Sequence, residues 1–557
     1  MTKTIIKIPL CVGAICLLTA CGDGGGNSPL FNQEPAFAPA LPASEVNNAA
    51  PDGPLNSAEA YRLVEQTTFG PQLDDITQAQ AGPEAWINAQ MQMPATFMTD
   101  GLYKANSSRW NEYVNVWWRQ AIKADDQLRQ RVAFALSEIF VVSAHDGLGQ
   151  EQFGLANYYD ILLRHSFGNY RDLLTDITLN PVMGEYLSMK GNRKPDPDKN
   201  IQPDENYARE LLQLFSIGQV MLNEDGTPIL DKDGVPKAAY DQTVIENFAR
   251  VFTGWHFANA EDFKWPKNKD YITPLKAWQE YHDTDAKTLL RRAEIPAGLT
   301  AEEDLNLALN NVFNHPNVGP FLSKQLIQRL VTSNPSTQYV RDVAAVFNQN
   351  ISGERGNLAS VVKAILMHNE ARFGHEDNPD TFGKLKEPLI RLSQLWRAFE
   401  PDTIHYNFNY GWAKHELGQA PLNSPSVFNF FRPDFSQPGE ISNLGLDSPE
   451  FEILDETSVI TITSRLLAST LWSHNFKNEN DANRIAINIT REMDLEPDED
   501  ALLDHLDLLL LGGQMSAEMR TELKELMSAR SYANAASQRV VEAIFLIVTS
   551  PDAAIQR

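Results

Sequence analysis

The chain has 557 residues, a formal net charge of -26 at pH 7 and a hydrophobic content of 43%. This acidic excess disfavours nucleic-acid binding and docking on anionic lipid headgroups, because phosphate groups would be repelled rather than neutralised. A chain of this length can bury a large core without disulfide bonds, and its three cysteines are Cys11, Cys16 and Cys21, all close to the N-terminus.

The first residues have the pattern of an export signal. Two lysines precede an uncharged run that ends in Leu18-Thr19-Ala20-Cys21 and is too short to span a bilayer stably. We expect a lipoprotein signal peptide over residues 1–20 and lipid modification of Cys21, through which the protein would contact the membrane of the cell envelope. Because Gly22 rather than Asp follows the cysteine, the outer membrane is favoured, facing the periplasm or the surface. The alternative is a membrane anchor that is never cleaved.

The next segment and the body of the chain differ in composition. Residues 21–57 are rich in Gly, Pro, Ala and Asn and contain no Lys or Arg, which is typical of a flexible tether. Helical periodicity begins near Ser57 and continues to the C-terminus. We predict a main helical domain over residues 58–447 and a C-terminal helical region over 448–557 that packs on it.

Apolar residues recur at spacings of three and four through most of the chain, with charged residues on the opposite side. This pattern predicts helices over 128–140, 151–165, 205–217, 242–253, 302–313, 319–331, 339–348, 357–367, 384–398, 457–471, 500–511, 516–528 and 534–548. The expected fold is mainly α, a large multi-helix bundle with long irregular loops.

Three segments lack this period. Between 218 and 241, Asp225-Gly226 and Asp233-Gly234 supply the positive φ angles of tight turns, which predicts a small β-hairpin or a double turn near 219–240. A calcium loop is the alternative, but the stretch lacks the closing Glu that such loops have. Residues 258–281 and 401–448 are predicted to be long irregular connections, which are often functional in compact proteins.

The segment from Pro203 to Gly218 carries the densest cluster of polar side chains on a predicted helix. Glu205 and Arg209 lie four residues apart as an ion pair, and Asn206 and Glu210 lie beside them at the same spacing. If the cluster projects into a cleft, Glu205 or Glu210 is a candidate general base, Arg209 a candidate anion-binding group and Asn206 a binding residue. The alternative is a salt-bridge network that fixes helix packing.

Two histidines are candidate site residues because one follows the end of a predicted helix and the other follows an irregular segment. Trp255 and His256 come directly after Gly254, which is expected to end a helix, and His282-Asp283 stands at the exit of the irregular segment 258–281. We regard His256 and His282 as candidate catalytic residues and Trp255 and Asp283 as candidate binding residues. In the alternative interpretation these side chains only pack.

Other kinds of site lack support in the sequence. The eleven histidines are scattered singly without a His-Glu-x-x-His arrangement, and we find no Gly-x-Ser-x-Gly elbow, phosphate-binding loop or Rossmann fingerprint. We therefore predict no metal and no nucleotide, and the sequence names no cofactor.

The run from Asp204 to Gly218 resembles the hallmark helix of the large bacterial family catalogued as domain of unknown function 1800. Members typically show Asn-Glu-Asn-Phe/Tyr-Ala-Arg-Glu-Leu, and here Asp204 replaces the first Asn. Further matches follow in the family's order, over roughly residues 58–440: Gly168-Asn169-Tyr170-Arg171-Asp172-Leu173-Leu174, Phe252-Thr253-Gly254-Trp255, His282-Asp283, His315-Pro316 and Leu417-Gly418-Gln419 before Pro421, Ser424 and Pro425.

The resemblance implies an exported, predominantly helical protein and supplies no reaction. Many members carry a His-Asn-His-Phe-like motif where this chain has Ser137-Glu138-Ile139-Phe140. Members are commonly encoded next to a second exported family that resembles sulfatases and alkaline phosphatases, which implies a secreted sulfatase-like partner. Two hypotheses follow: an envelope lipoprotein that binds or supports a secreted partner or extracellular polymer, or a hydrolase acting on an extracellular glycan or ester.

Overall fold

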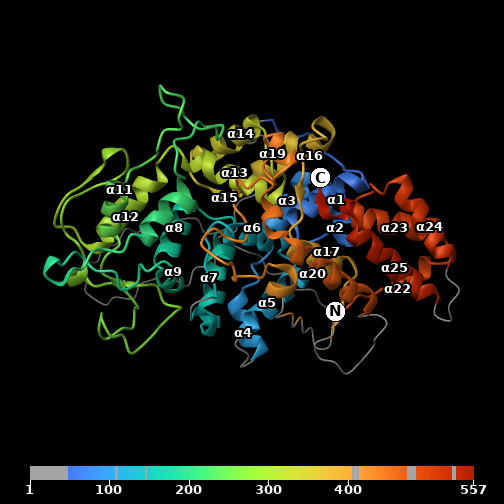
Figure 1. The fold of residues 1–557 in the computed structure, drawn as a ribbon, viewed down its shortest axis with the longest axis horizontal. Helices are drawn as coiled ribbons and strands as arrows, with labels where there is room; N and C mark the ends of the chain where they lie inside the picture. The colour runs from blue at the N-terminus through green and yellow to red at the C-terminus, as the bar shows by residue number, and fades with distance from the viewer. Residues whose placement is uncertain are drawn as a thin grey trace, which may run out of the picture. The chain divides into compact units, whose positions relative to one another are not determined.

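The computed structural model describes residues 48–106, 111–144, 147–403, 408, 410, 413–472, 485–529 and 535–557. The predicted signal peptide, Cys21 and most of the predicted tether lie outside the described residues. Within them the protein is mainly α-helical, so the predicted fold class is confirmed (Figure 1).

The helices follow one another closely along the chain. The first group comprises α1 (Ser57–Thr67), α2 (Leu73–Ala79), α3 (Pro83–Met91), α4 (Met98–Ala105), α5 (Glu112–Lys123), α6 (Gln127–Ser137), α7 (Gln152–His165), α8 (Tyr170–Thr178), α9 (Pro181–Tyr186), α10 (Asn206–Glu210), α11 (Gln242–Val251) and α12 (Ala301–Phe313). The second comprises α13 (Val318–Leu330), α14 (Thr337–Asn348), α15 (Leu358–Met367), α16 (Asn369–Asp377), α17 (Pro388–Ala398), α18 (Ala413–Leu417), α19 (Glu440–Asn443), α20 (Glu456–Leu467), α22 (Thr490–Leu495), α23 (Glu499–Leu511), α24 (Ala517–Ala529), α25 (Ala535–Thr549) and α26 (Pro551–Ala554).

Strands are short and pair two by two. The antiparallel pairs are β1 (Trp255–His256) with β2 (Lys276–Ala277), β3 (Lys287–Thr288) with β4 (Glu294–Ile295), β5 (Lys384–Leu385) with β8 (Ile555–Gln556), and β6 (Asp402–Thr403) with β7 (Ile485–Ala486). Short 3-10 turns stand at η2 (Leu148–Gln150), η3 (Pro197–Lys199), η5 (Gln279–Tyr281), η6 (Leu290–Arg292) and η8 (Pro449–Ile453), and π-helical turns at η4 (Leu211–Ser216) and η9 (Ala468–Trp472).

Side-chain caps define where several helices begin. Asn56 caps α1 and Thr300 caps α12, each in a capping box with the Glu three residues later. Such a cap satisfies backbone N–H groups that would otherwise lack a partner, and it contributes about 1 kcal/mol. These caps explain why the predicted starts of α1 and α12 agree closely with the observed ones, whereas the helix predicted from 384 begins only at Pro388, after β5.

One continuous apolar core runs through residues 60–553. Its largest side chains include Trp117 and Trp118 of α5 and Trp396 of α17, all almost fully buried. The Trp118 and Trp396 rings meet edge to face with their centroids 5.1 Å apart, a favourable geometry for aromatic pairs. The core therefore joins early and late parts of the chain.

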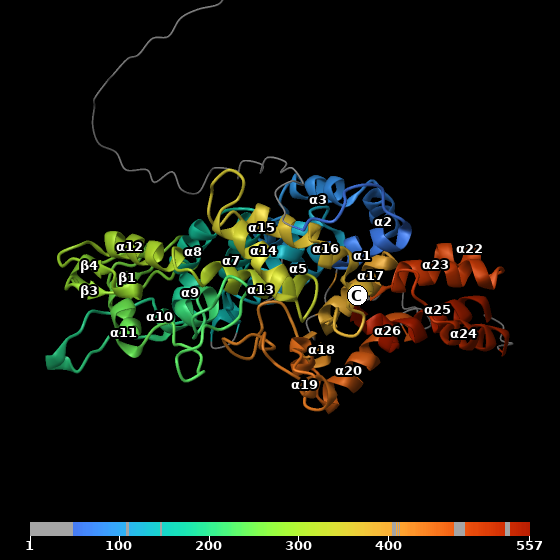
Figure 2. The same ribbon diagram turned by 90° about the horizontal axis from the view of Figure 1, so that it is seen from above.

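The helices are arranged around a central group. In Figures 1 and 2, α13, α14 and α15 lie together in the middle, with α8, α11 and α12 on one side and α22 to α25 on the other. Helix α13 packs against α14 and α6, and α14 against α15. The groove described below opens beside α13.

Residues 219–239 form a turn module rather than a regular hairpin. Met221 N–H donates to Lys237 O at 2.8 Å, Ile229 N–H to Met221 O at 2.7 Å, and Lys237 N–H to Ile229 O at 2.9 Å, which closes a ring of three hydrogen bonds. The predicted turns at Gly226 and Gly234 separate the three stretches, and both glycines have positive φ angles. This module lies beside the C-terminal end of the segment Asp204–Gly218, which is called the hallmark segment below.

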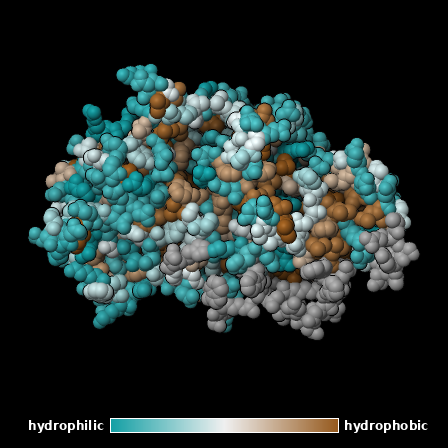
Figure 3. Space-filling model, viewed as in Figure 1, coloured by the Kyte–Doolittle hydropathy of each residue, from teal (hydrophilic) through white to brown (hydrophobic). Residues whose placement is uncertain are grey.

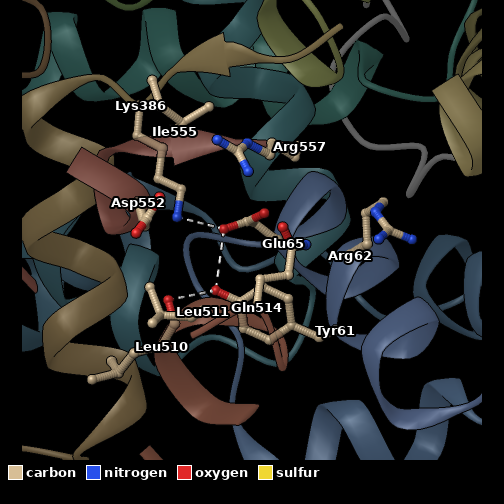
Figure 4. A pocket seen from close by; sticks show the side chains of 10 residues that line it. All are labelled: Tyr61, Arg62, Glu65, Lys386, Leu510, Leu511, Gln514, Asp552, Ile555 and Arg557. Atoms are coloured by element: carbon tan, nitrogen blue, oxygen red, sulfur yellow. Dashed lines mark hydrogen bonds and ion pairs between the residues drawn. The ribbon is translucent and has the colours of Figure 1, made fainter. Parts of the chain in front are cut away.

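The C-terminal region packs onto both early and middle parts of the chain. Lys384 of β5 lies opposite Gln556 of β8. Lys386 Nζ lies 2.6 Å from Glu65 Oε1 of α1, and the Tyr61 hydroxyl donates to the Leu510 carbonyl of α23 at 3.0 Å (Figure 4). In the described part of the chain, no helix has the length and apolarity that crossing a membrane requires.

Candidate functional site

The hallmark segment is not one regular α-helix. Helix α10 covers only Asn206–Glu210 and continues as the π-helical turn η4, in which the N–H groups of Ile217 and Gly218 both donate to Leu212 O at 3.0 Å. Gly218 ends the segment with φ of +74°, as the sequence predicts. The wider turn differs from the expected uniform helix, and π-helical turns occur frequently at functional sites.

The ion pair predicted on this segment lies near the surface. Arg209 Nη2 lies 2.9 Å from Glu205 Oε2, and the Gln242 side chain of α11 donates to the same oxygen at 2.9 Å. Asn206 is exposed, and its N–H donates to Asp204. These contacts connect α10 to α11.

Glu210 is buried, unlike its neighbours Glu205 and Asn206. Burial raises its pKa, and Arg209 opposes that shift. Burial and the charge of Glu210 also raise the pKa of Tyr240 to about 12. Neither Glu210 Oε2 nor the Tyr240 hydroxyl has a hydrogen-bond partner among the described residues.

His282 and Asp283 belong to a buried polar network. His282 is fully buried, with Nδ1 3.0 Å from Thr253 O and Nε2 3.1 Å from Asp304 Oδ2, which also accepts from Lys287 Nζ at 2.6 Å. Asp283 pairs with Arg250 through two hydrogen bonds, and these help to lower its pKa, although burial acts in the opposite direction. The network holds α11, β3 and α12 together.

Trp255 and His256 form strand β1, and both side chains are buried. His256 borders a pocket together with Gly191 and the segment 263–266. None of the other predicted site residues lines that pocket. The structure therefore places the predicted residues in four environments rather than in one cleft: a surface pair of Glu205 and Arg209, the buried Glu210, the buried network of His282 and Asp283, and the pocket beside His256.

A larger groove, with a volume of about 560 Å³, lies beside α13. The end of the hallmark segment, the turn module, α13 and the loop 427–434 form its walls. The apolar lining includes Leu214, Leu222, Phe321, Val427, Phe428 and Phe431. In Figure 3, apolar residues gather over the middle of the face, whereas the side formed by α8, α11 and α12 is mostly hydrophilic.

A buried pair of carboxyl groups underlies this groove. Glu138 and Glu387 are almost fully buried; the Asn429 side chain donates to Glu138, and the Gln419 side chain donates to Glu387. Burial first, and then the charge of Glu387, raises the pKa of Glu138 well above its ordinary value. Arg329 Nε, 3.6 Å from Glu138 Oε2, opposes this shift.

The groove offers neutral hydrogen-bonding groups. The side chains of Gln213, Gln219, Gln325 and Gln328 line it. Gln325 Nε2 and Gln328 Oε1 are buried and have no hydrogen-bond partner in the part of the chain that the structure describes. A buried polar atom without a partner is costly, and both atoms belong to side chains that line the groove.

The basic side chains that line the groove are already paired. Lys324 lies 3.3 Å from Asp447 and Arg432 lies 3.2 Å from Glu452, whereas the buried Arg329 donates to the backbone carbonyls of Gln325 and Glu138. Asp434 adds an exposed carboxylate. These charges give an anionic ligand little attraction.

Sequence reasoning missed Glu138, Arg329 and Glu387. Glu138 features in the sequence only as a departure from a histidine motif, although it interrupts an apolar run from Val132 to Val142, where a charged residue is unusual. The motif residue Gln419 donates to Glu387, which no local pattern could indicate. Among the described residues no group of three His, Cys, Asp or Glu side chains is arranged to hold a metal ion.

Comparison with known proteins gives one family. The model of the family described as protein of unknown function (DUF1800) matches residues 62–555. No curated protein and no solved structure matches the chain.

Proposed function

The chain belongs to the DUF1800 family, and because that family's description names no reaction, we propose a function from the groove: binding of a neutral, hydroxyl-rich extracellular polymer, most simply a glycan. The observation that carries the proposal is the combination of aromatic walls with two glutamine side-chain atoms, Gln325 Nε2 and Gln328 Oε1, that have no hydrogen-bond partner among the described residues. Sugar rings present apolar faces that pack on aromatic side chains and hydroxyls that both donate and accept. A groove of this volume suits a few sugar units.

The cellular setting is part of the proposal. Lipid modification at Cys21 would hold the body at the cell envelope, with the outer membrane favoured. There the groove could meet an extracellular polymer, or a secreted sulfatase-like protein could use the body as a support. Of these partners, the groove chemistry favours the polymer.

The test is calorimetric titration of the full chain, purified in detergent, with neutral glucan, mannan and xylan oligosaccharides. Phe428 lines the groove and is 46% exposed, so Phe428→Ala should leave folding intact. We expect it to weaken binding about tenfold, which corresponds to 1.4 kcal/mol of stacking. Tyr103→Ala, at an aromatic side chain that is 67% exposed and does not line the groove, should bind like the wild type. Absence of binding to every oligosaccharide, or equal binding by Phe428→Ala, would contradict the proposal.

Hydrolysis of the same polymer is the second candidate, and the Glu138–Glu387 pair favours it. A carboxyl group kept protonated at a groove floor can act as a general acid. Under this alternative the wild type releases reducing ends from a bound glycan. Glu138→Gln keeps the shape and the binding but abolishes release. If the wild type binds without releasing products, the protein is a binding module.

A further inference from the structure

The pocket beside His256 has a different chemistry from the groove. Its volume is about 400 Å³, and Lys190, Gly191, Arg193 and Lys264 line it together with His256 and Trp265. Strand β1, which carries His256, lies on the hydrophilic side of the molecule near α11 and α12 (Figures 2 and 3). In a chain with a formal charge of -26, a pocket lined by several cations is unusual and indicates an anionic ligand.

His256 presents a fixed N–H donor to this pocket. The Phe257 N–H donates to His256 Nδ1 at 2.8 Å, which places the ring proton on Nε2. Burial first, and then the charge of Lys190, lowers the pKa of His256 to about 4, so the ring is neutral at pH 7. No acceptor for Nε2 is found among the residues that the structure describes. A side chain at position 191 would reach 3.7 Å from Nε2, so glycine there keeps the approach open.

Two of the cations have no carboxylate partner in the described part of the chain. Lys190 is paired with Glu185 at 2.9 Å and lies over the Phe257 ring. Arg193 and Lys264, by contrast, form no ion pair in the described structure. The nearby Asp262 accepts the backbone N–H groups of Lys264 and Trp265. The pocket therefore keeps an unbalanced positive charge beside a neutral donor.

An aromatic ring stands next to this charge. Trp265 lines the pocket and is 81% exposed, the most exposed of the large apolar side chains described. Its ring has no aromatic partner among the described residues. The exposed indole therefore offers a free face beside the charged pocket, against which a ring of the ligand can pack.

We propose that this pocket binds an oxyanion carried on a sugar ring: a sulfate ester, phosphate ester or carboxylate held by Arg193, Lys264 and His256 Nε2, with the ring against Trp265. The choice of a sugar rests on the proposed function, whereas the oxyanion rests on the pocket alone. The protein would then bind an acidic glycan unit here and neutral units in the groove.

The experiment titrates the full chain with glucose 6-sulfate, glucose 6-phosphate and glucuronate, and with glucose, inorganic sulfate and inorganic phosphate. At least one sugar anion should bind more tightly than glucose and than the inorganic ions. The double variant Arg193→Gln/Lys264→Gln should weaken that binding at least about tenfold, the loss expected for charge-assisted hydrogen bonds. Lys267→Gln/Lys269→Gln removes the same charge from the same loop outside the pocket and should change it little.

Each other outcome overturns a definite part of the proposal. If no anion binds, or if both double variants lose the same amount of affinity, the pocket is not an oxyanion site. Equal affinity for inorganic and sugar anions would show that the pocket recognises the oxyanion but not the sugar ring. Binding to phosphatidylglycerol vesicles that depends on Arg193 and Lys264, without sugar binding, would make a lipid headgroup the ligand. Phe428→Ala should leave sugar-anion binding unchanged, which separates this proposal from that of the groove.

Discussion

Glu138 is a buried carboxyl group in the lining of the groove, so its protonation changes the charge of the groove floor. Its ordinary pKa is 4.5, and in the folded protein the pKa lies well above that value. As the pH rises above 4.5, Glu138 ionises in the unfolded chain but stays protonated in the folded one. The folded protein then binds more protons, so its stability falls with pH until the folded pKa is passed.

We therefore expect the wild type to lose stability relative to Glu138→Gln as the pH is raised from 4.5 towards neutrality, by at most about 1.4 kcal/mol per pH unit. Urea unfolding of both proteins over this range measures the difference. Glu302→Gln, on the exposed side of α12, is the matched control and should run parallel to the wild type. A parallel curve for Glu138→Gln would mean that Glu138 is ionised in the folded protein.

For single residues, the sequence indicates which side chains are unusual but not which groups surround them. The sequence offers His282 and Asp283 as candidate site residues, and in the structure they lie in a buried polar network whose partners Asp304 and Arg250 lie on helices that adjacency in sequence cannot reveal. Lipid modification at Cys21 stays a prediction. Burial, which separates Glu210 from Glu205, depends on packing against distant segments.

Among the elements, the junction between the hallmark segment and the groove depends on Gly218. Its φ is +74°, and a Cβ built there would lie 3.0 Å from the Phe321 ring of α13. Gly218→Ala should destabilise the protein by about 1–3 kcal/mol, because it adds a steric overlap to the strained backbone. The displaced Phe321 should also weaken glycan binding in the groove.

Chemical unfolding and titration of the same variant check both effects. Gly353→Ala is the control, because its φ is +78° but the nearest atom, Gln349 Nε2, lies 3.9 Å from the built Cβ. Gly353→Ala should be destabilised only by the backbone strain, and it should bind glycans as tightly as the wild type does. Equal losses in the two variants would show that Phe321 moves aside without cost.

Helix positions were largely predictable, and the groove was not. The apolar period predicts α12 and α13 nearly to their ends, because capping and amphipathicity are local properties. The π-helical turn at Leu211–Ser216 was missed, since its apolar residues also fit an ordinary helix. The groove walls come from four separate parts of the chain, and only tertiary packing brings them together.

For the whole molecule, the ion pair between Lys386 and Glu65 connects α1 to the residue that directly follows β5, the strand that pairs with β8 near the C-terminus. Both side chains are buried. Lys386→Met would leave the Glu65 carboxylate buried without its cation, and we expect a loss of about 3–5 kcal/mol.

Urea unfolding of the full chain measures this loss. Lys524→Met is the control, because Lys524 pairs with Asp500 of α23 at the exposed surface; that change should cost less than about 1 kcal/mol. Small and equal losses would mean that the C-terminal region is held to α1 by apolar contacts alone.

The contact between Tyr61 and Leu510 also fixes an order of events during synthesis. The two residues are 449 positions apart, and a ribosome adding about 5–20 residues per second needs roughly 20–90 s to make that stretch. Throughout this interval, the face of α1 that will meet α23 has no native neighbour. A nascent chain of this kind therefore leaves that face uncovered until its last helices have been made.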